Sequence, residues 1–347
     1  GLSAEDIEQM VGRQKELIQS IIVPLKAYEY CNIQERPWLN RYLQEILNSS
    51  DLDAFEVGQK MKYLVYYAYL ITYLHRLQIL PDIRLYNDAE TVPIATNLVL
   101  DIGNSRTFGL IAEDPIDTSF SKSSIIKLRD LETGELYAEP FDMRLCFKEE
   151  AFDIPSPDGM FKWPSVVRLG KEAIRSIYSG DQDLDTPSQF DTSYSSPKRF
   201  LWDTEPYSSQ WKYISEKDRF IGPARTVDYD GIMQQFYNEG RFAPNPQEMG
   251  DKSSYSRSSL MTFCFIEILL QVRQQINSYE FRLNNGEEDK KRVIKRVILT
   301  CPTAMAKEEQ KTLRRAMEEA SIVLKRYYTN TYNQPYNPEG DTDKIEI

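Results

Sequence analysis

A run of apolar residues that ends in an aspartate and a glycine is the feature that most constrains how this chain can fold. Residues 97–111 read NLVLDIGNSRTFGLI, so one strand leads into Asp101, a polar turn follows, and a second strand begins. Gly103 permits close backbone approach, small polar turn residues offer donors to phosphate oxygens, and an aspartate can hold hydrated Mg²⁺. A plain hairpin with Asn104 and Ser105 at its tip has the same pattern, so both alternatives stay open.

Composition limits the classes of function. A length of 347 residues is typical of one large domain or two smaller ones, and a hydrophobic content of 41% is enough for a sizeable core. The formal net charge is −11, so we expect no nucleic-acid partner and no membrane-surface role that rests on bulk charge. The sequence has neither the P-loop pattern nor the glycine pattern of a dinucleotide-binding Rossmann turn.

Cysteine and histidine usage argues against zinc or histidine-rich metal sites and against histidine-dependent nucleophilic catalysis. The single histidine, His75, gives little basis for a Ser-His-Asp or Cys-His mechanism. The cysteines are too widely spaced for a zinc site or a disulfide framework, and we expect buried thiols in a reducing, cytoplasmic compartment: Cys31, Cys146, Cys264 and Cys301. The opening residues GLSAEDIEQM lack the layout of a signal peptide.

Residues 1–90 are predicted to form an all-α N-terminal region. Ser3 and Asp6 resemble a capping box, and Pro81 ends the last helix because proline cannot continue it. The uncharged run at 63–74 is too short for a bilayer span of about 20 residues, so we predict a buried helix and no membrane insertion. Because the chain begins almost on a helix cap, we expect it to be a piece of a longer protein.

Residues 91–347 change to an α/β pattern with a mixed sheet. The apolar runs LVL (98–100) and VIL (297–299) show no alternation, which favours strands covered on both faces. Helix 258–278 is apolar nearly all round at its start and should be buried. Strands are expected at 96–102, 107–113, 122–128, 141–147 and 293–300. A second helix, 306–327, carries an apolar stripe of Leu313, Met317, Ala320 and Leu324, and about 175–255 should form an irregular insertion.

Four segments in order resemble the actin, Hsp70 and sugar-kinase superfamily of ATPases. After the hairpin come WPSVVRLGKEA (163–173), SSPKRFLWD (195–203) and RVILTCPTAMAKEEQKTLRRAMEEA (296–320), similar to successive Hsp70 landmarks. The resemblance implies an actin/Hsp70-like, ribonuclease H-like first lobe over 91–347.

A closer resemblance is to the SrfB-like virulence-factor family of bacterial proteins. It rests on LDIGNSRTFG (100–109), SSPKRFLWD (195–203) and YSRSSLMTF (255–263), and with the strand and helix at 296–320 it covers roughly 95–325. The family resemblance implies an actin-like ATPase fold more firmly than it implies a reaction.

The superfamily resemblance implies ATP and Mg²⁺ as cofactors. Asp101 would be the carboxylate that organises the metal ion and a water, and Lys198 would stabilise charge on the transferring phosphoryl group. The turn would lie over the β- and γ-phosphates, with Gly103, Asn104, Ser105, Arg106 and Thr107 as the cofactor-binding residues.

Several of these assignments have alternatives. Arg106 could contact phosphate or pair with a nearby acid. Lys198 could be a surface cation in a polar loop, and Arg199 is a weaker candidate than Lys198. Cys301 is predicted to be a small buried hydrophobe, because no histidine is present to activate it as a nucleophile.

The superfamily's second phosphate loop and adenosine motif do not occur after Thr303, so the chain is expected to hold half of an ATPase cleft. The first hypothesis for function is a Mg-ATP-dependent conformational switch. This hypothesis leaves open whether the protein hydrolyses ATP. The second is a catalytically inactive actin-like scaffold that binds protein partners, and the third is a small-molecule kinase or phosphatase. Convergence of Asp101 and Lys198 on one cavity would favour the switch over the scaffold.

Overall fold

A computed structural model describes most of the chain from residue 92 onward, and the chain divides into two compact units, residues 1–86 and 87–347. The described residues are 92–113, 122–152, 161–180, 193–208, 210–214, 226–227, 231–245, 254–288, 290–331, 334–338, 341 and 344–347, with isolated positions between 62 and 77.

In the first unit, the predicted capping box at Ser3 and the predicted helix end at Pro81 lie outside the described residues. The described helical positions include Tyr66 and Tyr73, which are 55% and 52% exposed. The prediction of a buried helix is therefore wrong for these side chains, although Ile71 on the same segment is buried.

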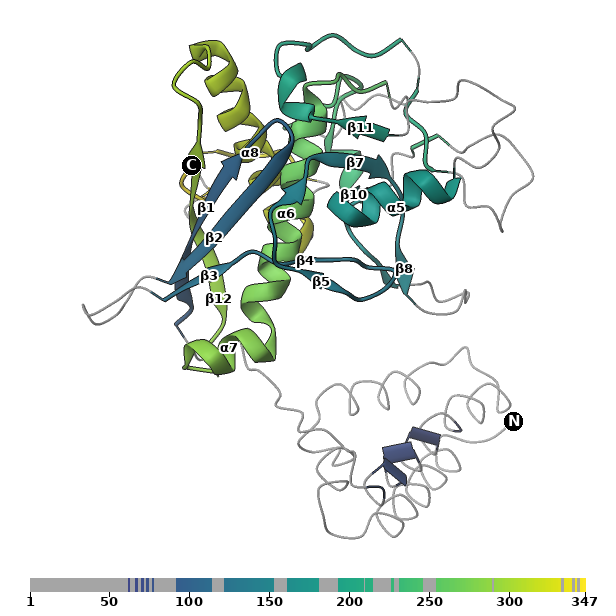
Figure 1. Ribbon diagram of the computed structural model, residues 1–347, viewed down its shortest axis with the longest axis vertical. Helices are drawn as coiled ribbons and strands as arrows, with labels where there is room; N and C mark the ends of the chain where they lie inside the picture. Colours follow the sequence, from purple (N-terminus) through teal and green to yellow (C-terminus); the bar gives the residue numbers. More distant parts are fainter. Residues whose placement is uncertain are drawn as a thin grey trace. The chain divides into compact units, whose positions relative to one another are not determined.

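The centre of the second unit is a mixed sheet built around the predicted hairpin (Figure 1). Among the described residues the strand order is β12-β1-β2-β3, and β6 also pairs with β2. β1 runs parallel to β12, and the β1–β2, β2–β3 and β2–β6 pairs are antiparallel. The bounds are β1 Ile94–Ile102, β2 Arg106–Glu113, β3 Ser123–Ile125, β6 Phe141–Asp142 and β12 Arg292–Thr300.

The side chains on one face of this sheet are more deeply buried than those on the other face. Leu98 pairs with Val297 in the parallel register, and both are 1% exposed. The next pair in that register is Val99 and Ile298, and Ile298 is 45% exposed. Because successive side chains point to opposite faces, the expectation of strands covered on both faces is wrong for this part of the sheet.

The strands predicted at 122–128 and 141–147 each break into two pieces, and part of them leaves the central sheet. β7 (Arg144–Phe147) lies between β10 (Val167–Leu169) and β11 (Ser193–Ser195) in a second sheet. β4 (Leu128–Arg129) pairs with β5 (Leu136–Tyr137), and β8 (Ala151–Phe152) pairs with β9 (Phe161–Lys162).

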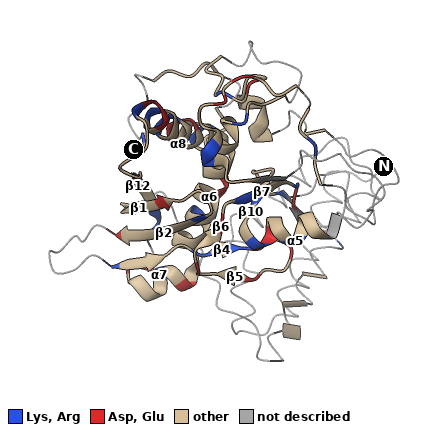
Figure 2. Ribbon diagram, turned by 45° about the horizontal axis from the view of Figure 1, so that its top comes forward, with Lys and Arg blue, Asp and Glu red and all other residues tan. Residues whose placement is uncertain are grey.

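The two long helices form where the apolar spacing predicts them. α6 (Ser259–Asn277) is buried along most of its length and packs against α8, β12 and β10. α8 (Lys307–Tyr328) buries its predicted stripe and carries charges of both signs along its length, whereas α6 is mostly uncharged (Figure 2). The shorter helices are α5 (Gly170–Gly180), α7 (Tyr279–Asn285) and the 3₁₀ turns η1 (Pro197–Phe200) and η2 (Gly231–Gln235). In the described residues, no helix has the length and apolar character needed to cross a bilayer.

Candidate functional site

The β1–β2 hairpin closes over a turn in which Gly103 approaches Arg106 closely. Ile102 is paired with Thr107, and the Gly103 N–H donates to the Arg106 carbonyl at 3.0 Å. A Cβ at position 103 would lie 2.3 Å from that carbonyl oxygen. Glycine is therefore required here by contact within the turn itself, which is an explanation independent of any ligand.

Asp101 stands exposed at the end of β1, next to the end of β12. Thr300 Oγ1 donates to Asp101 Oδ1 at 2.5 Å. Parallel pairing brings the two carboxyl ends to one edge of the sheet, where a carboxylate can be held without being buried. The described residues contain no cluster of three acidic, histidine or cysteine side chains suited to a metal ion. A single carboxylate at this edge still fits Mg²⁺, which is bound through one or two carboxylates together with waters and phosphate oxygens.

Lys198 reaches the same hairpin from a distant part of the chain. Its side chain is buried, and Nζ donates to the Ile102 carbonyl at 2.5 Å. The preceding Ser196 adopts a left-handed φ of 59°, and its N–H donates to the Met143 carbonyl at 2.7 Å. This turn before η1 places Lys198 beside Ile102, the residue that follows Asp101. The alternative that Lys198 is a surface cation in a polar loop is therefore wrong.

Arg106 and Thr107 lie where β2 leaves the turn. The β2–β6 pairing sets Arg106 opposite Asp142, and Arg106 Nε lies 3.3 Å from Asp142 Oδ1. Both side chains are substantially exposed, so the pair contributes little stability. Thr107 is 1% exposed, and its Oγ1 has no hydrogen-bond partner among the described residues. Asn104 is exposed at the tip of the turn.

Ser105 is also exposed, and its carbonyl accepts from the Met143 N–H at 2.8 Å. Arg199 is exposed, whereas the neighbouring Lys198 is buried. Cys301 is exposed, so its prediction as a buried hydrophobe is wrong: β12 ends at Thr300, and Cys301 begins the loop before α8. The burial expected of Cys146 and Cys264 is confirmed, whereas Cys31 lies outside the described residues.

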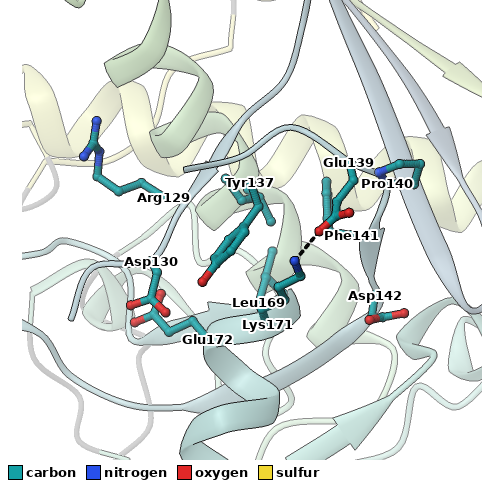
Figure 3. Close-up of a pocket in the computed structure, with 11 residues that line it drawn as sticks. Arg129, Asp130, Tyr137, Glu139, Pro140, Phe141, Asp142, Leu169, Lys171 and Glu172 are labelled. Atoms are coloured by element: carbon teal, nitrogen blue, oxygen red, sulfur yellow. Dashed lines mark ion pairs between the residues drawn. The ribbon is translucent and has the colours of Figure 1, made fainter. Parts of the chain in front are cut away.

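A small cavity is lined by residues of β4, β5, β6 and β10 and by the start of α5 (Figure 3). Glu172, from the first turn of α5, reaches this cavity and is 4% exposed. Its Oε2 accepts from the Leu131 N–H at 3.2 Å, while Oε1 has no hydrogen-bond partner among the described residues. Burial raises the pKa of Glu172 to about 7, although nearby Arg168 opposes the rise.

Sequence reasoning missed Thr300, Asp142 and Glu172. Thr300 could have been found, because it ends a strand that was expected in the same sheet as β1. Asp142 carries no such signal, since its partner Arg106 lies 36 residues away and the pairing follows from β6. Glu172 lies at a helix start that is charged in sequence, so nothing local marks it as buried.

The described residues thus define a mixed α/β protein in which a hairpin turn, a buried lysine and a parallel strand end meet at one sheet edge. The family model described as virulence factor SrfB matches residues 21–342. The chain belongs to this SrfB virulence-factor family, which confirms the family resemblance drawn from the sequence motifs. No curated protein matches the chain.

Proposed function

We propose that this chain supplies the first phosphate-binding loop of a Mg-ATP-dependent conformational switch with an actin/Hsp70-like fold. The observation that carries the proposal is the hydrogen bond from Lys198 Nζ to the Ile102 carbonyl. It joins two segments that the superfamily resemblance singled out, although they are 96 residues apart. A ligand phosphate at the exposed turn would then face both Asp101 and the lysine segment.

The topology supports the proposal. In open α/β sheets, ligands bind outside the carboxyl ends of the strands. The carboxyl ends of β1 and β12, the β1–β2 turn and the loop into α8 all lie at that edge of the sheet (Figure 1).

The roles of the residues follow from their chemistry. Asp101 would hold the hydrated metal ion, with Thr300 fixing the orientation of its carboxylate. Lys198 would stabilise charge on the phosphoryl group, and one of its three N–H groups already donates to the Ile102 carbonyl. Arg106 would exchange its weak ion pair with Asp142 for a phosphate oxygen, since guanidinium groups bind phosphate well.

The alternative function is a scaffold without nucleotide, and one observation favours it. The three groups that should meet the ligand already have partners within the chain: Asp101 with Thr300, Arg106 with Asp142, and Lys198 with Ile102. Such a set of contacts also explains these residues as parts that hold the hairpin in place. In that case the SrfB family's link to virulence would act through protein partners.

Calorimetric titration of Mg·ATP into this chain tests the proposal. We expect saturable binding that weakens at least tenfold in Asp101→Ala, which corresponds to about 1.4 kcal/mol or more. Glu280→Ala is the matched control, because it also removes an exposed carboxylate but lies on α7 and not at this sheet edge. Equal affinity in Asp101→Ala and wild type would refute a nucleotide site at this turn. Absence of heat with wild type would mean that this chain does not complete a nucleotide site by itself, as a scaffold or half of a cleft would not.

A further inference from the structure

A second and much larger cavity lies at the other end of the two parallel strands. It has a volume of about 700 Å³ and is lined by the starts of β1 and β12, by α6 and by the last turns of α8. β1 runs from Ile94 near this cavity to Asp101 at the candidate site. At about 3.3 Å per residue the two places are roughly 20 Å apart, so the cavity is separate from the proposed nucleotide site.

The lining of this cavity is strongly cationic. Among the described residues that line it, six are basic and one is acidic, in a chain whose net charge is −11. The acidic residue is Asp341. The basic residues are Arg273, Lys291, Arg292, Lys295, Lys325 and Lys344.

Two of the basic residues form ion pairs with acidic residues of this chain. Arg292 is buried and pairs with Glu113 at 2.9 Å. Lys325 pairs with Asp341 and lies in the last turn of α8, where a cation is favourable for the helix dipole. Lys295 and Lys344 stand exposed on β12 and on the tail that pairs with it, where a ligand can reach their side chains.

The inner wall of the cavity is apolar. α6 contributes Leu269 and Ile276, β12 contributes Ile294, and α8 contributes Ile322 and Leu324. At one side Tyr328 is covered by the Arg273 guanidinium, whose Cζ lies 3.4 Å from the ring centroid. The cavity thus combines an aliphatic wall with an aromatic ring and a cationic lining.

We propose that this cavity binds a small organic anion with an apolar body, such as a medium-chain carboxylate. Its volume lies within the range of about 300 to 1,000 Å³ that is usual for pockets that bind organic ligands. A neutral apolar molecule would leave the cationic lining unused, and a small hydrophilic anion would leave the aliphatic wall in contact with water. Since the whole chain is acidic, the excess of basic residues here is a local property of the cavity.

Fluorescence of 8-anilinonaphthalene-1-sulfonate, an anion with an aromatic body, provides the binding assay, with no nucleotide present. We expect a saturable signal that decanoate displaces, whereas acetate and decanol displace it at least tenfold less effectively. Acetate tests charge alone, and decanol tests the apolar chain alone. Displacement by decanol as effective as that by decanoate would show a plain apolar patch and overturn the proposal.

Charge reversal at the two exposed lysines locates the site. We expect Lys295→Glu/Lys344→Glu to weaken binding of the dye and of decanoate at least tenfold, while Lys295→Arg/Lys344→Arg retains it. Lys307→Glu/Lys311→Glu, which reverses two exposed lysines near the start of α8, controls for the same change in net charge. Circular dichroism checks that each variant is folded. Unchanged affinity in the double reversal, or no saturable binding by wild type, would overturn the proposal, and neither result bears on ATP.

Discussion

Replacement of Glu172 by glutamine should stabilise the protein at neutral pH. The carboxyl group is 4% exposed, and its Oε1 lacks a hydrogen-bond partner among the described residues. Glutamine has nearly the same shape, so its side-chain oxygen can still accept from the Leu131 N–H. The substitution thereby removes a buried negative charge and keeps the hydrogen bond.

The expected magnitude follows from the pKa of Glu172, which burial raises from 4.5 to about 7. Below pH 4.5 the group is neutral in both the folded and the unfolded chain, and ionisation costs no stability. Between pH 4.5 and 7 the unfolded chain loses its proton first, so the free energy of unfolding falls as pH rises. A shift of this size corresponds to about 3 kcal/mol, reached in full above pH 7.

Thermal unfolding followed by circular dichroism at pH 5 and pH 8 measures this effect. For a domain of this size, about 3 kcal/mol corresponds to a rise of roughly 6 to 12 °C in Tm. We expect Glu172→Gln to exceed wild type by this amount at pH 8 and by much less at pH 5. Glu139→Gln is the control, because Glu139 lines the same cavity but is exposed, and the Lys171 ammonium lowers the pKa of Glu139 (Figure 3).

Two results would refute the reasoning about Glu172. One is a Tm for Glu172→Gln at or below that of wild type at pH 8. The other is a gain of equal size at both pH values, which would show that the benefit comes from packing and not from removal of charge. A rise in Tm for the Glu139→Gln control would also count against the reasoning, because the Glu139 carboxylate is exposed and not buried.

Two further predictions concern the hairpin and the thiols. Gly103→Ala should lower the free energy of unfolding by about 1 to 3 kcal/mol, since its Cβ would collide with the Arg106 carbonyl; an unchanged denaturation midpoint in urea would contradict this. Cys301, which is exposed, should react with a thiol reagent in the folded protein, whereas Cys146 and Cys264 should react only after unfolding. Burial raises the pKa of the Cys146 thiol to about 12, and it also raises that of Cys264; equal rates for all three in the folded state would disprove the assigned burial.

Much of the central scaffold could be predicted from local patterns. The hairpin at 97–111 and the helices α6 and α8 follow from apolar periodicity, which depends on neighbours a few residues away. The stripe of α8 is buried as predicted, with Leu313 and Met317 each 0% exposed. Local pattern failed for Ile298, because a strand's second face is covered only if another element packs there.

The sequence by itself determined the hairpin strands, the strand at 293–300 and the two long helices, whereas the need for glycine at position 103 follows from its contact with the Arg106 carbonyl. Only the tertiary structure decided that Lys198 lies buried against Ile102 and that Thr300 holds Asp101, since these contacts join segments about 100 to 200 residues apart. It also decided the pKa of Glu172 and the gathering of six basic residues around one cavity. Burial and charge depend on which distant segments meet in space, and residue order alone does not specify that.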